Sequence, residues 1–355
     1  MDQEPSPLTP APAQPEGVRW PTDEWPTGQP PASAGLDELL DAVFDDHGPL
    51  ATTYAVVVVH RGRLVAERYG GQIEHWDRPA EPVGPDTELL SWSSAKSMLH
   101  AAVGILVGEG RLRLDEAAPV PQWAGPGDPR AAITLQQLLE MRDGLAFAED
   151  YVEAGGSDVI EMLFGAGQDD VAAFAADRPL AAPPGERFYY SSGASNIISG
   201  VVAREVGPGD PYIRFLEDRL FHPIGARSAR PKLDEAGTWI ASSYVYATAR
   251  DFARFGYLYL RGGVWDGRPI LPAGWVDHGR RPRSVDPEDG PYGAHWWVDG
   301  DAHGTFSARG YEGQYVTVCP GLDLVFVRLG RTPAEHKPDL RRWRSRVVEA
   351  FAATT

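Results

Sequence analysis

A serine and a lysine three residues apart are the first residues in this sequence that could do chemistry. Ser93 and Lys96 lie in the stretch SWSSAKSMLH, and lysine occurs elsewhere only at Lys232 and Lys337. If the segment is helical, both side chains lie on one face within reach of each other. The apolar residues that follow predict a buried helix, and burial lowers the pKa of a lysine. Ser93 is therefore a candidate nucleophile with Lys96 as its base, and the alternative is a serine that only caps a helix.

Tyr190 is the next candidate, in the segment PGERFYYSSGASNIISG. It stands between an aromatic, strand-like piece and a Ser/Gly-rich elbow that opens a helix. A tyrosine at such an elbow can point its hydroxyl into a cleft and relay a proton to a leaving group. Taken alone, Tyr190 is better explained as a core tyrosine with one satisfied hydroxyl.

Two glycines mark a third segment, FSARGYEGQYVTVCPGLDLVFVRLG. Gly310 and Gly313 would let another group approach the backbone of a strand closely, as an oxyanion site or a substrate-docking edge requires. The alternative is a β-bulge.

The chain around these segments has 355 residues, 43% of them hydrophobic, and a formal net charge of −17. Such a charge argues against nucleic acids and anionic membranes as partners and favours small molecules or peptides. The N-terminal residues lack the features of an export signal, no apolar run spans a bilayer, and Cys319 is the only cysteine. We therefore expect a cytoplasmic protein without an internal disulfide.

Metal and cofactor motifs are not found in the sequence. No histidine pair has the spacing of a metal site such as HExxH, and surface or packing roles are expected for His60, His100, His295 and His303. No glycine loop of the dinucleotide or P-loop type follows a strand, so we infer neither a metal nor a cofactor. Glu149 and Asp150 are expected on the solvated surface, with Tyr151 beside the cleft.

The secondary structure pattern predicts an α+β fold. Residues 1–32 are rich in proline and predict a disordered or loosely packed tail. Residues 33–355 are expected to form a single catalytic domain. Within it, residues 33–90 and 290–355 carry strands and two terminal helices that would cover one face of the sheet, while residues 91–289 are mainly helical. Residues 54–60 and 63–69 are expected to be two strands joined by a tight turn at Arg61-Gly62. The two ends would pair in one antiparallel sheet, leaving a cleft between the sheet and the helical part.

Several motifs in fixed order give the chain a resemblance to a known superfamily. Ser93-Ser94-Ala95-Lys96, PGERFYYSS, ITLQQLLEMRDGL, TARDFARFG and GYEGQ together resemble the serine β-lactamases and penicillin-binding proteins. Within that superfamily, the chain is most similar to class C-like esterases and the 6-aminohexanoate-dimer hydrolase type. The resemblance covers nearly everything after residue 35. It implies a five-stranded antiparallel sheet with flanking terminal helices beside a mainly helical subdomain.

The resemblance also implies roles for individual residues. Ser93 would be the acylated nucleophile, Lys96 its base and Tyr190 the partner that shuttles the proton. The backbone N–H groups of Ser93 and Tyr311 would form the oxyanion hole. Gly310 and Gln314, in the same motif as Tyr311, are expected at the oxyanion or substrate-binding edge.

Two motifs depart from the superfamily pattern. Many relatives have Tyr-x-Asn where this chain has Tyr190-Ser191-Ser192, so the amide contact to the substrate is missing or comes from Asn196. Ser192 and Asn196 are both expected at the oxyanion or substrate-binding part of the site. Where β-lactamases have Lys-Thr-Gly, this chain has Ala308-Arg309-Gly310. The expected cation is therefore absent at position 308, and strand alternation would turn Arg309 to the opposite face.

Together these features predict a serine hydrolase that forms an acyl-enzyme on a small ester or amide. The alternative is a protein that binds or senses a β-lactam or peptide and acylates without efficient turnover. The presence of Ser93, Lys96 and Tyr190 together argues against that alternative, because a binding module needs no such trio. The oligomeric state cannot be predicted from the sequence.

Overall fold

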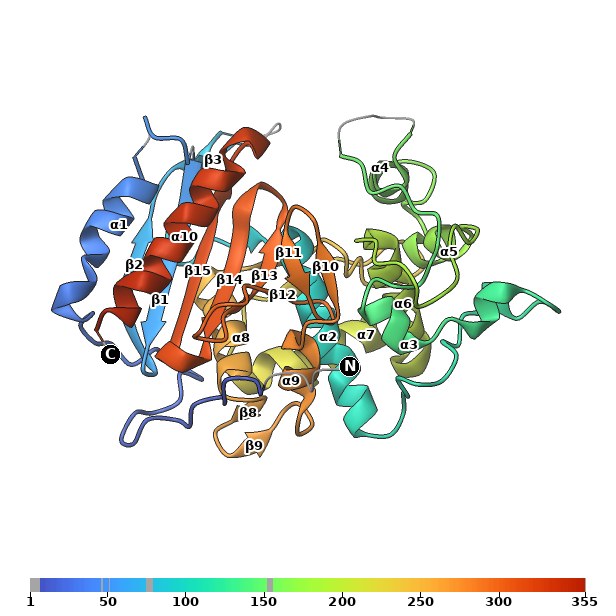
Figure 1. Ribbon diagram of the computed structural model, residues 1–355, viewed down its shortest axis with the longest axis horizontal. Helices are drawn as coiled ribbons and strands as arrows, with labels where there is room; N and C mark the ends of the chain where they lie inside the picture. The colour runs from blue at the N-terminus through green and yellow to red at the C-terminus, as the bar shows by residue number, and fades with distance from the viewer. Residues whose placement is uncertain (1–6, 46, 51, 75–78, 152–155, 355) are drawn as a thin grey trace, which may run out of the picture.

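The computed structural model describes residues 7–45, 47–50, 52–74, 79–151 and 156–354. Its two parts lie side by side, a sheet covered by helices on both faces and a group of mostly short helices (Figure 1). The helices are α1 (Leu36–Val43), α2 (Ala95–Gly108), α3 (Leu135–Leu139), α4 (Asp158–Phe164), α5 (Val171–Ala176), α6 (Ser192–Val206), α7 (Asp210–Leu216), α8 (Ala249–Leu260), α9 (Trp275–Arg280) and α10 (Lys337–Ala352). Within the described ranges, none of them is long and apolar enough to cross a membrane.

The main sheet is antiparallel, and it joins the two ends of the chain as the pattern predicted. Its strands follow the order β10-β11-β12-β13-β14-β15-β1-β2. They are β1 (Thr52–His60), β2 (Arg63–Tyr69), β10 (Ser284–Asp286), β11 (Gly290–Tyr292), β12 (Trp297–Val298), β13 (Phe306–Gly310), β14 (Gln314–Cys319) and β15 (Leu324–Arg331). The expected number of five strands is wrong, because the short strands β10, β11 and β12 extend the edge to eight within the described residues.

The other strands are short and form small separate sheets. The pairs β3 (Gln72–Ile73) with β4 (Glu81–Pro82), and β8 (Val264–Trp265) with β9 (Arg268–Pro269), are two-stranded. Three strands, β5 (Leu89–Leu90), β7 (Val245–Ala247) and β6 (Arg230–Pro231), form a sheet beside the start of α2. This small sheet anchors the segment before the predicted nucleophile, since the N–H of Ser91 donates to the carbonyl of Val245.

The first hairpin forms where the sequence predicted it. Strands β1 and β2 are joined by Arg61 and Gly62, whose φ angles are 49° and 74°. Positive φ at both central positions is the conformation that a tight hairpin turn requires, and glycine adopts it without steric cost.

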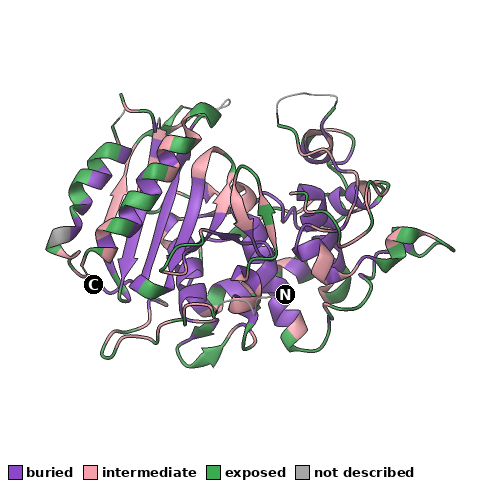
Figure 2. Ribbon diagram, in the orientation of Figure 1, coloured by how far each residue is buried: buried purple, intermediate pink, exposed green. Residues whose placement is uncertain are grey.

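The two faces of the sheet bury different sets of side chains. Val57 and Val59 of β1 lie in the core shared with α2 and α8, whereas Val56 and Val58 face α1 and α10. This alternation is the period of two that a strand imposes. Terminal helices α1 and α10 therefore cover one face, as predicted, and α8 lies against the other (Figures 1 and 2).

The proline-rich N-terminal segment is ordered over its described part. Trp25 is only 7% exposed, and Arg254 of α8 donates to the carbonyl of Pro21 at 2.7 Å. Farther along the segment, Thr27 bridges to Leu64 on the exposed edge of β2. Residues 7–31 thus differ from the expected loose tail, because their backbone carbonyls and one tryptophan find partners on α8 and β2. Composition alone could not reveal these contacts.

Candidate active site

Ser93 lies in a tight 3₁₀ turn, Trp92–Ser94, that leads directly into α2. Trp92 has a φ of 44°, a left-handed conformation that is unfavourable for a non-glycine residue. Its ring is held between Tyr311 and Tyr244, at centroid distances of 5.7 and 6.2 Å. The aromatic contacts stabilise the strained turn that presents the Ser93 hydroxyl at the start of the helix.

Lys96 lies three residues later, in the first turn of α2, and is buried, with 2% of its surface exposed. Its Nζ donates to Ser93 Oγ at 3.1 Å, to Ser192 Oγ at 3.0 Å and to the carbonyl of Ser242 at 2.8 Å. Burial lowers the pKa of Lys96 to about 8, and the charge of Glu149 partly opposes this shift. With this pKa, roughly one lysine in ten is neutral at pH 7, whereas at the ordinary pKa almost none would be, and a general base must be neutral.

Tyr190 lies on the other side of the same lysine. Its ring centroid is 5.0 Å from Lys96 Nζ and stacks on Trp297 at 5.6 Å. Burial raises the pKa of Tyr190 far above its ordinary value, the Glu149 charge raises it further, and a hydrogen bond with Ser93 lowers it in part. The structure therefore brings the predicted trio together and favours Tyr190 as a neutral phenol, which donates a proton rather than removing one.

Glu149 joins this network, contrary to its expected place on the solvated surface. Its Oε1 accepts from Ser192 Oγ at 2.6 Å, and its Oε2 accepts from the backbone N–H of Ser192 at 2.7 Å. The Tyr151 hydroxyl also donates to Oε1. Ser192 is the first residue of α6, where a carboxylate is stabilised by free N–H groups and the helix dipole. The sequence carried no signal for this contact, because Glu149 lies in a loop 43 residues away.

Helices α2 and α6 are held together behind the lysine by His295. Its carbonyl accepts from Ser97 Oγ at 2.6 Å, and its ring lies 3.0 Å from Ser195 Oγ and 2.8 Å from the Leu139 carbonyl. Burial lowers the pKa of His295 to about 3, so the ring is neutral. Since a carbonyl only accepts, Nδ1 donates to Leu139 and Nε2 accepts from Ser195. His295 has the packing role that was predicted for it.

Gly310 and Tyr311 reach the nucleophile from the end of β13. A Cβ at position 310 would lie 2.4 Å from the carbonyl oxygen of Ser91, so only glycine permits this approach. The next residue, Tyr311, is 47% exposed, and its ring stacks on Tyr151 at 5.3 Å. The close approach supports the prediction that backbone N–H groups of Ser93 and Tyr311 could serve one oxyanion, which stays a prediction.

Gln314 and Asn196 do not reach the substrate side of the site as predicted. The Gln314 amide donates to the carbonyls of Tyr311 and Gly330 and accepts from the Gly330 N–H, so it braces the loop that carries Tyr311. Asn196 is fully buried, and its amide bonds to Ser242 and the Met162 sulfur. Both amides are used inside the protein, that of Gln314 by backbone groups and that of Asn196 by Ser242 and the Met162 sulfur. The hydroxyl of Ser192, the other candidate for substrate binding, is likewise buried and bonds to Lys96 and Glu149.

Ala308 and Arg309 of the third motif face opposite sides of the sheet, as strand alternation predicted, although Arg309 still borders the cavity into which Ser93 opens. Ala308 is buried, while Arg309 extends toward α10, where it donates to Ser307 Oγ, the carbonyl of Asp289 and, at 2.6 Å, Asp299 Oδ1. Arg344 of α10 bonds to the same Asp299 carboxylate. The cation of the third motif is thus replaced by an arginine whose guanidinium is occupied by protein acceptors.

Ser93 and Tyr190 open into a cavity of about 890 Å³. Its wall is rich in aromatic and acidic side chains. The described residues that line it include the aromatic side chains of Tyr151, Phe188, Tyr189, Trp297, Tyr311 and Tyr315 and the carboxylates of Glu149, Glu186, Asp286, Glu288, Asp289 and Glu312, against the cations Arg187, Arg309 and Lys337. A cavity of this size holds a small organic molecule.

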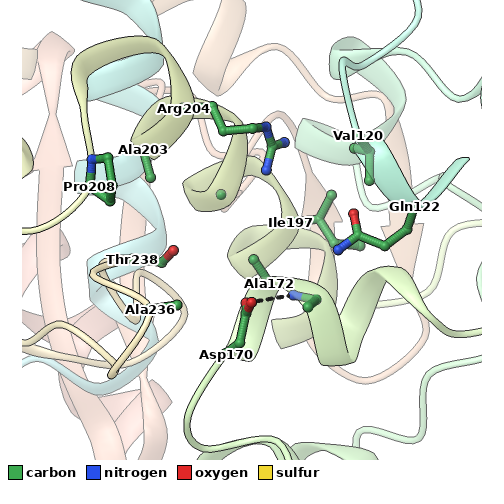
Figure 3. Close-up of a pocket in the computed structure, with 12 residues that line it drawn as sticks. Val120, Gln122, Asp170, Ala172, Ile197, Ala203, Arg204, Pro208, Ala236 and Thr238 are labelled. Atoms are coloured by element: carbon green, nitrogen blue, oxygen red, sulfur yellow. Dashed lines mark hydrogen bonds between the residues drawn. The ribbon is translucent and has the colours of Figure 1, made fainter. Parts of the chain in front are cut away.

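A smaller cavity of about 190 Å³ lies farther along α6 (Figure 3). Arg204 and Gln122 border it, together with Asp170, whose carboxylate accepts from the Ala173 N–H at 2.9 Å. None of the predicted catalytic residues lines it. The larger cavity is therefore the candidate active site.

Comparison with known proteins agrees with this geometry. The profile of the Beta-lactamase family matches residues 46–351. The chain belongs to this family. It is also 31% identical over 312 residues to "6-aminohexanoate-dimer hydrolase" of Paenarthrobacter ureafaciens, a match that covers 82% of this chain and 75% of that protein. The chain is a β-lactamase-related serine hydrolase.

Two solved structures show the same fold. A penicillin-binding protein homologue from Caulobacter crescentus superposes with a TM-score of 0.70 at 20% identity, covering 93% of this chain and 99% of the other. A family VIII carboxylesterase gives a TM-score of 0.70 at 16% identity, covering 92% and 98%. The predicted superfamily is confirmed, and the fold is the β-lactamase-like α+β arrangement.

The two neighbouring tyrosines of the second motif provide a matched pair for mutagenesis. Tyr190→Phe removes the hydroxyl next to Ser93, and we expect hydrolysis of a p-nitrophenyl ester to fall by roughly 100-fold or more. The ring of Tyr189 borders the cavity and is 40% exposed, and its hydroxyl accepts a long hydrogen bond of 3.5 Å from the backbone N–H of Glu149. Since Tyr189→Phe keeps that ring and removes only this weak contact, it should retain near-normal activity. Steady-state kinetics with both variants checks this. Equal losses, or a larger loss at position 189, would contradict the role assigned to Tyr190.

Proposed function

We propose that this protein hydrolyses a small ester or amide through an acyl-enzyme on Ser93. The observation that carries the proposal is the contact between Lys96 Nζ and Ser93 Oγ, with the lysine buried and the serine open to the cavity. Burying a lysine is costly, so a lysine that served only as a positive charge would lie in water. A buried lysine in contact with a hydroxyl that faces the cavity is what a general base requires.

Acylation begins with the attack of Ser93 on the carbonyl group of the substrate. Ser93 Oγ attacks the carbonyl carbon while its proton moves to neutral Lys96, and the carbonyl electron pair moves onto the oxygen. That oxyanion would be held by the N–H groups of Ser93 and Tyr311. The lysine becomes an ammonium that again has an oxygen acceptor for each of its three N–H groups.

Collapse of the tetrahedral intermediate needs a proton on the leaving group. Tyr190, kept neutral by burial, gives its proton to the leaving oxygen or nitrogen. It regains a proton from the Lys96 ammonium, one of whose N–H groups must turn from Ser93 to the Tyr190 oxygen for this step. Water then attacks the ester on Ser93 with the same groups in reverse order. The carboxylic acid product leaves, and Ser93 and neutral Lys96 are restored.

The cavity supports an uncharged or cationic substrate rather than an anionic one. Six carboxylates and three cations line it among the described residues. Two of the cations, Arg309 and Lys337, are paired with Asp299 and Asp289, and two of the carboxylates, Asp289 and Glu312, are paired with Arg341 and Arg331, so the lining keeps an excess of carboxylates. The name of one relative denotes amide hydrolysis and that of one structural neighbour denotes ester hydrolysis, which supports these two substrate classes.

Removal of the nucleophile tests the acyl-enzyme. We expect Ser93→Ala to abolish both ester turnover and labelling by a serine-directed fluorophosphonate, without loss of folding, because only one hydroxyl is removed. Intact-mass spectrometry and peptide mapping measure the label, and thermal melting checks the fold. Labelling that persists in the variant would assign the chemistry to another serine. A stoichiometric burst without turnover in the wild type would favour a binding or sensing protein.

The missing cation in the third motif predicts the substrate preference. Penicillins and cephalosporins carry a carboxylate, and the loss of one charged contact to it costs a few kcal/mol, or roughly 100-fold in kcat/KM. We therefore expect p-nitrophenyl butyrate to be hydrolysed with a much higher kcat/KM than a chromogenic cephalosporin on the same preparation. A higher value for the cephalosporin would show that Arg309 or another arginine binds the carboxylate.

A further inference from the structure

Three oxygen atoms surround Lys96 Nζ, and the direction of each hydrogen bond depends on whether the lysine is charged or neutral. As an ammonium, the lysine has one N–H for each of Ser93, Ser192 and the Ser242 carbonyl. As a neutral amine, it has two N–H groups and one lone pair. It can act as a base toward Ser93 only when that lone pair points at the Ser93 hydroxyl.

Two of the three oxygens can be assigned from their chemistry. The Ser242 carbonyl only accepts, so it always takes an N–H. Ser192 is a hydroxyl and could either accept from the lysine or donate to it. If it donated, it would occupy the lone pair and leave Ser93 facing an N–H.

Glu149 decides between the two directions for Ser192. Both donors of Ser192, its hydroxyl and its backbone N–H, go to the Glu149 carboxylate, at 2.6 and 2.7 Å. A hydrogen bond to a charged acceptor is about twice as strong as a neutral one, so the hydroxyl proton stays on that side. Ser192 is then left with lone pairs toward Lys96, and Ser93 is the one remaining proton donor for the amine.

We propose that Glu149 is a positioning residue that acts through Ser192 to direct the lone pair of neutral Lys96 at Ser93. The inference rests on the proposed function and extends it by one residue that does not touch the reacting atoms. The Ser192 hydroxyl lies between the Glu149 carboxylate and Lys96, so the carboxylate fixes the direction of the hydrogen bonds without contacting the ammonium directly.

The substitution Glu149→Gln reverses the direction with almost no change in shape. The Ser192 backbone N–H can only donate, so it requires the amide oxygen. The amide NH₂ then takes the place of Oε1, which accepts from the Ser192 and Tyr151 hydroxyls in the wild type, and donates to these hydroxyls instead. This sends the Ser192 hydroxyl proton toward Lys96. The two N–H groups of the neutral amine are left for Ser93 and Ser242, and the lone pair no longer meets the nucleophile.

The readout is the rate of Ser93 labelling by excess fluorophosphonate from about pH 6 to about pH 10, a range that spans the lysine titration. In Glu149→Gln, the rate on the high-pH plateau should fall by roughly 10- to 100-fold. The acid limb should move to lower pH, because the Glu149 charge raises the pKa of Lys96. Tyr190 and His295, which also lie near Lys96, stay neutral over the whole pH range, because burial raises the pKa of Tyr190 and lowers that of His295 to about 3.

Ser192→Ala provides a second, independent variant. Without that acceptor, the two N–H groups of the neutral amine turn to Ser93 and Ser242, so the plateau should fall by a similar factor. The acid limb should also move to lower pH, because the Lys96 ammonium loses one of its hydrogen-bond acceptors. Adding Glu149→Gln to Ser192→Ala should lower the plateau no further, because the two residues act as one unit. The exposed carboxylate of Glu235 is the control, and Glu235→Gln should match the wild type.

Each outcome bears on the inference. A wild-type plateau in Glu149→Gln, or an equal additional loss in the Ser192→Ala background, would overturn the positioning role and leave the acyl-enzyme intact. Peptide mapping of the label separates the two claims. If the label in the wild type lies on a serine other than Ser93, the proposed function and this inference both fail.

Discussion

The burial of one ammonium group, that of Lys96, is the constraint on which the rest of the site depends. A lysine that is 2% exposed has lost its hydration, and oxygens of the protein must replace it. Those oxygens come from the turn before α2, from the first residue of α6 and from the backbone of Ser242. The helices must therefore keep one fixed arrangement, since a shift would leave a buried charge without partners.

The same burial sets the chemistry. Among the described residues, the carboxylate that acts on Lys96 is Glu149, and it does so across the Ser192 hydroxyl instead of by a direct ion pair. A carboxylate in contact with the ammonium would favour the charged form and raise the pKa, which would weaken the base. One intervening hydroxyl leaves the lysine near the pKa that a base needs. Through the same hydroxyl of Ser192, Glu149 orients the lone pair of neutral Lys96.

Sequence reasoning predicted the parts of this site that depend on local spacing. Lys96 on α2 follows Ser93 of the preceding 3₁₀ turn by three residues and contacts it, and strand alternation gave the direction of Arg309. Elsewhere in the fold, the β1–β2 hairpin has its predicted turn at Arg61 and Gly62. Sequence reasoning missed features that depend on distant contacts. Glu149 joins α6 from a loop, and the amides of Gln314 and Asn196 are occupied by nearby groups that no spacing rule reveals. The three extra strands are two or three residues long, too short for a periodic pattern.

The central claim is that neutral Lys96 removes the proton from Ser93, and the pH dependence of acylation in the wild-type protein tests it most directly. The second-order rate constant for labelling of Ser93 should rise about tenfold per pH unit at low pH and level off with an apparent pKa of about 8, the value that burial gives Lys96. A rate that is already independent of pH near neutrality, or one that still rises toward the ordinary lysine value of about 10.4, would contradict the account.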